Sequence, residues 1–212
     1  MNLQLTLKRA GVTTGPKVTR ETRHSELSVI KSFLLGRVFF VSRATQKTFD
    51  FGSAVHETYL IGGTKRKLDA KETPLFLGML NSLNRHPIAR KLFADTVREK
   101  RVKWIYEGVK FGGTPDARKP GIINDLKTTA CINGQDFLKK AFEYGYFRQG
   151  VTYMIAVPGV KEFFIVGISK TPPHPVFVVL IQRYPDLVRY AKEELKFLTY
   201  FYKNYGTPKG KK

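Results

Sequence analysis

The chain of 212 residues carries 37 Lys and Arg against 17 Asp and Glu, which gives a formal net charge of +20 at pH 7. Its single cysteine, Cys131, excludes an internal disulfide framework and a four-cysteine zinc or iron–sulfur site. No apolar run approaches the length of a membrane span, and the N-terminus lacks the apolar core of a signal peptide. We therefore expect a soluble, cytoplasmic protein without a membrane partner.

The excess of positive charge predicts a polyanionic partner. Phosphate backbones attract such a surface without regard to base sequence, and the binding weakens steeply with salt. Nucleic acid is the favoured partner; a ribosomal or membrane-surface protein, or charge that serves only solubility, is the alternative. Because acidic residues are scarce, a place where several of them converge is informative.

The length predicts a single domain, since a chain of this size can bury about 70% of its unfolded surface. We divide the sequence into a basic N-terminal arm (1–24), one domain (25–206) and a basic tail (207–212). The arm mixes Lys and Arg with Gly and Pro and shows no period. Clamping of DNA and simple flexibility of a terminus explain it equally well.

The first part of the domain reads as helical. Apolar residues recur at helical spacing over 25–35, and again over 52–61, a segment that carries His56. Pro74 opens a third helix through Leu83, and a fourth follows His86-Pro87. A lone helical histidine is more often a structural group than a ligand, so its position alone assigns His56 no role.

The segment 99–129 reads as three antiparallel strands joined by two tight turns. The turn signals are Glu107-Gly108 and Lys119-Pro120. A two-residue loop at the first turn pairs Tyr106 with Val109 and, by counting back, Glu99 with Asp116. A two- or four-residue loop at the second turn pairs Ala117 with Ile122; a three- or five-residue loop would reverse the parity.

This register places Asp116 opposite Ile123 and makes Asp125 its diagonal neighbour, at roughly 7–8 Å. Glu99, Asp116, Asp125 and Lys127 then share one surface, and two carboxylates at that spacing suit one cation. The opposite face is the expected core side of the sheet. Its members are Val102, Trp104, Tyr106, Val109, Phe111, Ile122 and Leu126.

The rest of the chain alternates between helix and strand. We expect a helix over 135–142 that resumes after Gly145 through Ala156, strands over 162–169 and 176–182, and a last helix from Pro185. Gln149 and Tyr153 are four residues apart and so lie on one helix face. They can reach a substrate together, or they can serve hydrogen bonds in the interior.

Asp116, followed nine positions later by Asp125-Leu126-Lys127, resembles the split motif of the PD-(D/E)XK nucleases. The strings 113–116 and 125–129 look most like the RecB-type branch, in particular the phage exodeoxyribonuclease VIII (RecE-like) enzymes. The resemblance covers about residues 25–157. The ordered set that carries it is His56, Glu99, Asp116, Asp125-Leu126-Lys127, Gln149 and Tyr153.

The resemblance implies a mixed α/β fold, a restriction-endonuclease-like core with about five mostly antiparallel or mixed strands flanked by helices. It implies two Mg²⁺ or Mn²⁺ ions per site, since Mg²⁺ prefers carboxylate and water oxygens. The candidate metal ligands are His56, Glu99, Asp116, Asp125 and the carbonyl of Leu126. The candidate catalytic residues are Asp116, Asp125, Lys127, Gln149 and Tyr153.

The function expected on this basis is a metal-dependent exonuclease that degrades linear duplex DNA from an end, 5′ to 3′ and without sequence specificity. Phage-type recombination or replication, or degradation of host DNA, would be its setting, with a homo-oligomeric ring and a single-strand annealing protein as partners. The alternatives are an endonuclease or junction resolvase of the same fold, and a non-catalytic DNA-binding module.

Basic residues around the three strands and on the following helix are the candidate DNA contacts. Separation of the strands at a duplex end would need side chains near the metal, for which Tyr153 and the N-terminal arm are the candidates. The candidate DNA contacts are Lys103, Lys110, Arg118, Lys119 and Arg148.

Overall fold

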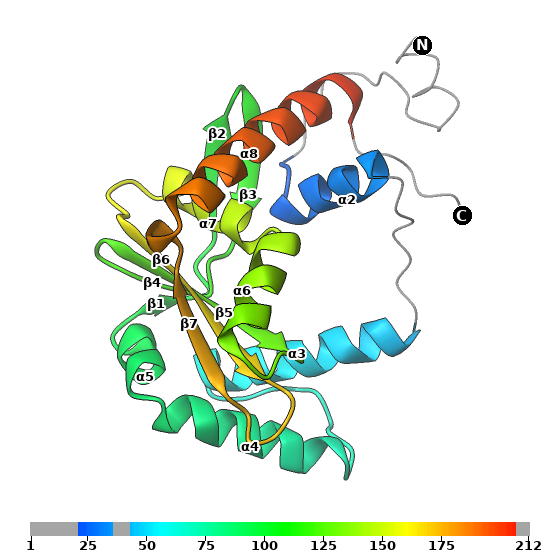
Figure 1. Cartoon of the computed structure of the whole chain (residues 1–212), viewed down its shortest axis with the longest axis vertical. Coiled ribbons are helices and arrows are strands. Elements are labelled where there is room, and N and C mark those ends of the chain that lie inside the picture. Colours follow the sequence, from blue (N-terminus) through cyan, green and yellow to red (C-terminus); the bar gives the residue numbers. More distant parts are fainter. Residues whose placement is uncertain (1–20, 36–42, 207–212) are drawn as a thin grey trace.

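The computed structural model describes residues 21–35 and 43–206, and a mixed five-stranded sheet forms its centre (Figure 1). Most of the predicted arm and all of the predicted tail lie outside the described residues. No helix of the described part is long and apolar enough to cross a membrane. The helices are α2 (His24–Leu34), α3 (Arg43–Ile61), α4 (Glu72–Arg85), α5 (Pro87–Phe93), α6 (Gly134–Glu143), α7 (Tyr146–Ala156) and α8 (Pro185–Tyr205).

The five-stranded sheet has the order β1-β4-β5-β6-β7. Its pairs are antiparallel except for β5 and β6, which run parallel because α6 and α7 form the crossover between them. The predicted mixed α/β fold is confirmed. The strands of this sheet are β1 (Val97–Arg98), β4 (Ala117–Lys119), β5 (Ile122–Thr129), β6 (Glu162–Ser169) and β7 (Val176–Leu180).

Two further strands, β2 (Val102–Tyr106) and β3 (Val109–Gly113), form a separate hairpin. Tyr106 pairs with Val109, as predicted, and the backbone N–H of Glu99 donates to the carbonyl of Asp116 at 3.2 Å. The prediction of three antiparallel strands in one sheet is wrong, because the chain leaves the extended conformation between hairpin and sheet and so divides the first two strands. Glu99 adopts φ +49°, and Pro115 has no N–H for a ladder.

The second turn is shifted by one residue from the prediction. Lys119 pairs with Ile122, so the loop is Pro120-Gly121, and Gly121 takes φ +77°. Pro followed by a positive-φ Gly is the pair that a type II turn favours. The predicted pairing of Ala117 with Ile122 is therefore wrong. The correct register differs by two residues, and this keeps the parity of every side chain.

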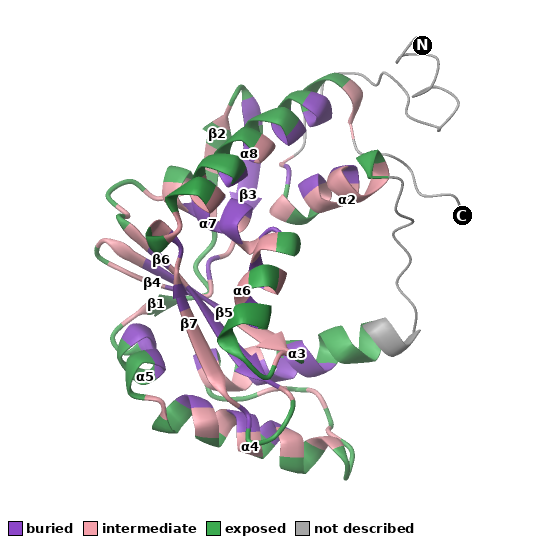
Figure 2. Cartoon of the chain, in the orientation of Figure 1, coloured by how far each residue is buried: buried purple, intermediate pink, exposed green. Residues whose placement is uncertain are grey.

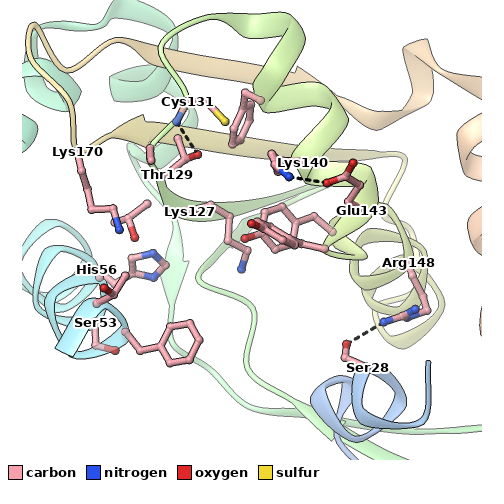
Figure 3. Close-up of a pocket in the computed structure, with 18 of the residues that line it drawn as sticks. Ser28, Ser53, His56, Lys127, Thr129, Cys131, Lys140, Glu143, Arg148 and Lys170 are labelled. Carbon is pink, nitrogen blue, oxygen red and sulfur yellow. Dashed lines mark hydrogen bonds and ion pairs between the residues drawn. The ribbon is translucent and has the colours of Figure 1, made fainter. Parts of the chain in front are cut away.

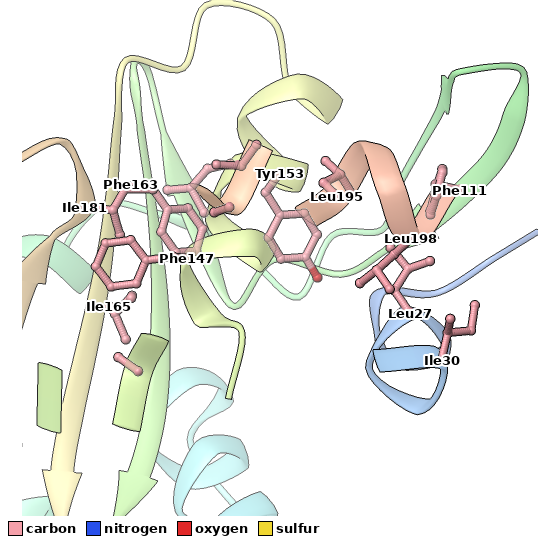
Figure 4. Close-up of a cluster of buried hydrophobic side chains, with 14 of the residues drawn as sticks. Leu27, Ile30, Phe111, Phe147, Tyr153, Phe163, Ile165, Ile181, Leu195 and Leu198 are labelled. Atoms are coloured by element: carbon pink, nitrogen blue, oxygen red, sulfur yellow. The ribbon is translucent and has the colours of Figure 1, made fainter. Parts of the chain in front are cut away.

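Both faces of the sheet are buried, whereas the sequence predicted one core side (Figure 2). Ile123 packs in a cluster with α2, α6, α7, α8 and the hairpin, and Leu126 packs in a second cluster with α3, α4 and α5. Trp104 and Phe111, predicted to share a face with Leu126, lie instead in the cluster of Ile123, because the hairpin has turned away from the sheet. Figure 4 shows part of that first cluster.

The predicted helices are confirmed, and their boundaries change. Helix α3 begins nine residues before the predicted Gly52, and the strand predicted to run to Gln182 ends at Leu180, where a short 3-10 helix (Ile181–Arg183) begins. Gly52 brings α3 close to the sheet, since a Cβ at that position would lie 2.8 Å from Thr128 Oγ1. Gly52 therefore allows α3 to pack closely against β5.

Neighbouring isoleucines of β5 offer a test of the two-cluster core. Ile123 is fully buried and Ile122 is half-buried, and both lie in the same strand. We expect Ile123→Ala to lower the free energy of unfolding by about 2–5 kcal/mol, because it leaves a cavity. Ile122→Ala loses the same β-branched group and should cost clearly less. Urea denaturation measures both, and equal losses would contradict the assignment of the core.

Candidate active site

Asp116 and Asp125 face one another on neighbouring strands. Asp116 directly precedes β4, and Asp125 lies within β5, the central strand of the sheet. Extending the pairing of Ala117 with Asn124 by one residue sets the two aspartates directly opposite, rather than diagonal as predicted. The backbone N–H of Leu126 donates to Asp116 Oδ2 at 2.7 Å. Burial raises the pKa of each carboxyl to about 6, although the nearby Lys127 ammonium opposes the shift. Each therefore carries an anionic charge at neutral pH that its surroundings only partly compensate.

Lys127 lies on the same side of β5, two residues after Asp125. Its Nζ is 2.6 Å from Asp125 Oδ2, but that oxygen has no aligned hydrogen-bond donor among the described residues. Burial disfavours the Lys127 ammonium, but the carboxylates of Asp125 and Asp116 outweigh it and raise its pKa. Lys127 is thus a fixed positive charge beside the two aspartates.

His56 reaches this group from α3. Its Nδ1 lies 3.6 Å from Asp116 Oδ2. Burial, followed by the positive charge of Lys127, lowers the pKa of His56 to about 4, so the imidazole is neutral at physiological pH. A neutral imidazole beside a carboxylate is a competent metal ligand. The structure thus brings His56 to the aspartates, and its role as a ligand stays a prediction.

Gln149 and Tyr153 approach from α7. The side-chain amide of Gln149 donates to Asp125 Oδ1 at 3.1 Å and so fixes the carboxylate from behind. Tyr153 is 6% exposed and packs against Trp104, and against Phe163 (Figure 4). Burial, with Asp125 as the next cause, raises the pKa of Tyr153 to about 12. Such a buried ring cannot separate DNA strands, so that earlier assignment of Tyr153 is wrong.

Glu99 stands at the edge of the group. Its side chain is exposed, and its backbone is held at φ +49° next to Asp116. Burial, together with Asp125 and Glu57, raises the pKa of Glu99. The Glu99 carboxylate, at the edge of the site, is therefore repelled by the negative charges of its neighbours.

The donor set fits a hard divalent cation. Two carboxylates face one another, and the nearby Lys127 ammonium, 2.6 Å from Asp125 Oδ2, balances only one of their two negative charges. Mg²⁺ commonly takes one or two carboxylates and completes its shell with water. The described residues contain no group of three or more His, Cys, Asp or Glu side chains placed to hold an ion by themselves. A site here would therefore rely on Asp116 and Asp125, with water and substrate oxygens.

A cavity of about 870 Å³ opens beside this group, between α2, α3, β5 and α6 (Figure 3). His56 points into this cavity from α3, and Lys127 points into it from β5. Its walls add three cations that the sequence analysis did not select, namely Lys31, Lys140 and Lys170. Lys31 pairs with Glu194 at 2.6 Å, Lys140 pairs with Glu143 at 2.7 Å, and burial lowers the pKa of Lys170.

Four of the five predicted DNA contacts fall into three groups. Lys103 and Lys110 are exposed on the outer face of the hairpin. Arg118 is half-buried on β4. The Lys119 ammonium donates to the carbonyl of Lys91 at 2.9 Å, at the C-terminal end of α5, so it serves that helix end.

Arg148 does not fit its predicted role. Its side chain is 1% exposed, and its guanidinium donates to Glu194 at 2.5 Å, to Ser28 at 2.8 Å and to His24 at 3.1 Å. Burial lowers the pKa of Arg148, and Glu194 opposes the shift. Because its donors are used inside the protein, the assignment of Arg148 as a DNA contact is wrong. It joins α2, α7 and α8.

The fold resembles solved exonuclease structures. A candidate exonuclease from Eubacterium rectale matches with a TM-score of 0.54 at 18% identity, over 84% of this chain and 66% of that protein, slightly under two thirds of its length. A phage-related exonuclease from Haemophilus somnus 129PT matches with a TM-score of 0.43 at 15% identity, over 87% and 94% of the two chains. An alkaline exonuclease from Laribacter hongkongensis matches with a TM-score of 0.33 at 15% identity, over 85% of this chain and 91% of that protein.

Neither a protein-family model nor a curated protein matches the chain. At these identities the likeness to the Eubacterium rectale structure concerns the fold alone. The chain therefore has a mixed α/β fold that it shares with the Eubacterium rectale protein.

The raised pKa values of Asp116 and Asp125 predict competition between protons and metal. Both values, about 6, exceed the ordinary 3.8, so these groups favour folding most below pH 3.8 and lose that contribution as the pH rises to about 6. A bound cation would offset the uncovered charge. We expect Mg²⁺ to raise the melting temperature more at pH 7.5 than at pH 5, as measured by thermal shift.

The double variant with Asn at positions 116 and 125 is the control, because it removes the charge and keeps the shape. It should show no pH-dependent gain from Mg²⁺. A gain in wild type that is the same at both pH values, or that survives in the double variant, would show that the metal binds elsewhere.

Proposed function

We propose that the protein is a metal-dependent DNA exonuclease that hydrolyses phosphodiester bonds at the ends of linear duplexes. The observation that carries the proposal is the convergence of Asp116, Asp125 and Lys127, with two carboxylates directly opposed and the Lys127 side chain at the wall of one cleft. In a chain with 17 acidic residues and a net charge of +20, such convergence is hard to explain by solubility. The fold shared with the Eubacterium rectale protein is consistent with this proposal.

The residues divide the chemistry between them. Asp116 and Asp125 would hold Mg²⁺ or Mn²⁺, which when bound polarises a phosphate oxygen and lowers the pKa of a coordinated water. Gln149 keeps the Asp125 carboxylate in one orientation. Lys127, permanently charged, orients the attacking water or neutralises charge that develops on the scissile phosphate. His56 and Glu99, at the edges of the pair, are the proposed ligands of a second ion.

Substrate recognition would rest on the backbone of DNA. The charge of +20 favours contact with many phosphates, and such contacts carry no base information. Lys103 and Lys110 on the hairpin are exposed and remain the proposed contacts. The 5′ to 3′ direction, a ring of several copies and cooperation with a single-strand annealing protein belong to the same proposal.

End-labelled linear duplex and closed circular DNA, each incubated with Mg²⁺, test the proposed function. We expect the linear DNA to shorten from its 5′ ends and the circle to stay closed. Activity should fall steeply between about 50 and 200 mM salt, because phosphate contacts release counterions. Nicking of circles at a comparable rate would favour an endonuclease or resolvase. Retention of both DNAs without cleavage would favour a binding module.

Substitutions separate metal binding from DNA binding. Asp125→Asn should abolish Mg²⁺-dependent cleavage while DNA affinity stays close to wild type, because it removes a metal ligand and no surface cation. Lys127→Ala should lower kcat by about 10²–10³-fold, the scale of one lost electrostatic contact in the transition state. Kinetics at saturating DNA and a binding assay with EDTA provide the two readouts.

Asp186→Asn is the matched control, since Asp186 is an exposed acid on α8 outside the cleft. It should behave as wild type in both assays. Full cleavage by Asp125→Asn would disprove the site, and a Lys127→Ala variant with lower affinity but unchanged kcat would assign Lys127 to DNA anchoring.

A further inference from the structure

The side chain of Lys127 has a second neighbour besides Asp125. Its Nζ lies 5.0 Å from the centre of the Tyr146 ring, at cation–π distance, while Asp125 Oδ2 lies 2.6 Å from the same nitrogen. Both Lys127 and Tyr146 line the cleft. The ammonium is therefore in contact with a carboxylate and with an aromatic ring.

The position of the Tyr146 ring is fixed by the start of α7. Gly145 precedes the helix with φ +76°, and a Cβ there would come within 2.8 Å of Arg148 Nη2. Arg148 is itself locked by Glu194 and Ser28. The first turn of α7 is thus attached to α8 and α2, and the Tyr146 ring is held by backbone that has little freedom.

The second helix residue that matters, Gln149, lies three positions after Tyr146. Residues three apart lie on one helix face, so the same turn of α7 presents a ring to Lys127 and an amide to Asp125. Gln149 donates to the carboxylate, and Tyr146 faces its ammonium partner. One helical turn therefore contacts both members of the Lys127 and Asp125 pair.

We infer that Tyr146 is a positioning residue that holds Lys127 in its place in the cleft. A lysine ammonium sits on a flexible four-carbon stem, and Asp125 alone fixes only its distance from one oxygen. The ring restricts the remaining directions. This inference rests on the proposed function for its kinetic consequence, but the contact between ring and ammonium is testable without cleavage.

Substitution of the ring provides the kinetic test. Tyr146→Leu should lower kcat about tenfold with KM nearly unchanged, the scale of one desolvated cation–π contact. Tyr146→Phe keeps the ring and should restore kcat. Tyr200→Leu, the same change at an exposed tyrosine of α8, controls for loss of a tyrosine elsewhere. A loss in Tyr146→Phe equal to that in Tyr146→Leu would overturn the inference, because the hydroxyl and not the ring would then matter.

A double variant shows whether the effect passes through Lys127. In a Lys127→Ala background the further change Tyr146→Leu should leave the residual kcat unchanged, because nothing remains to be positioned. A tenfold loss that persists in this background, or a rise in KM instead of a fall in kcat, would assign Tyr146 to contact with the substrate and overturn the inference.

Nuclear magnetic resonance of protein with ¹³C-labelled lysine tests the contact independently of nuclease activity. The Lys127 Cε–Hε signal, assigned by its absence in Lys127→Arg, should be shifted upfield by the Tyr146 ring. The shift should disappear in Tyr146→Leu and remain in Tyr146→Phe. An unchanged Lys127 signal in Tyr146→Leu would overturn the inference, whereas absence of cleavage by wild type would count only against the proposed function.

Discussion

The structure depends on the burial of two opposed carboxylates and one ammonium between β4, β5 and α7. Asp116 and Asp125 together carry two negative charges when ionised, and Lys127 supplies one positive charge, which leaves the group with one excess negative charge. Buried charges are costly unless they are paired and hydrogen-bonded. The Leu126 N–H and the Gln149 amide reduce this cost from two sides, and the remaining negative charge is what a divalent cation would offset.

A second ion pair, between the buried Arg148 and the partly buried Glu194, supports the first from a distance. Arg148 and Glu194 join α7 to α8, and Ser28 extends the contact to α2. Because Gln149 directly follows Arg148 in α7, this network sets the helix that braces Asp125. Breaking a buried pair leaves an uncompensated charge, so these helices have little freedom to separate. The position of the candidate active site thus depends on contacts between α2, α7 and α8 at the far wall of the cleft, where Ser28 and Arg148 lie.

The sequence predicted which candidate site residues lie close together better than it predicted the pairing of the strands. The hairpin register at Glu107-Gly108 was predictable because a two-residue turn leaves one pairing, and this placed Glu99 beside Asp116. At the second turn, loops centred on Lys119-Pro120 and on Pro120-Gly121 put the same side chains on each face of the sheet. The predicted pairing was therefore wrong by two residues, while Asp116 and Asp125 stayed on one face. The burial of Arg148 was not predictable, because its partner Glu194 lies far along the chain and no local sequence pattern indicates that the two residues pair. Tyr146 had a usable signal, its spacing of three from Gln149.

Diffraction from crystals soaked in Mn²⁺ tests the central claim most directly, because anomalous scattering locates the ion without reference to activity. We predict a peak between the carboxylates of Asp116 and Asp125, which should be absent from crystals of Asp125→Asn. A well-occupied Mn²⁺ peak elsewhere with none between these two aspartates, or a peak there that persists in Asp125→Asn, would contradict the assignment of the two carboxylates as the metal site.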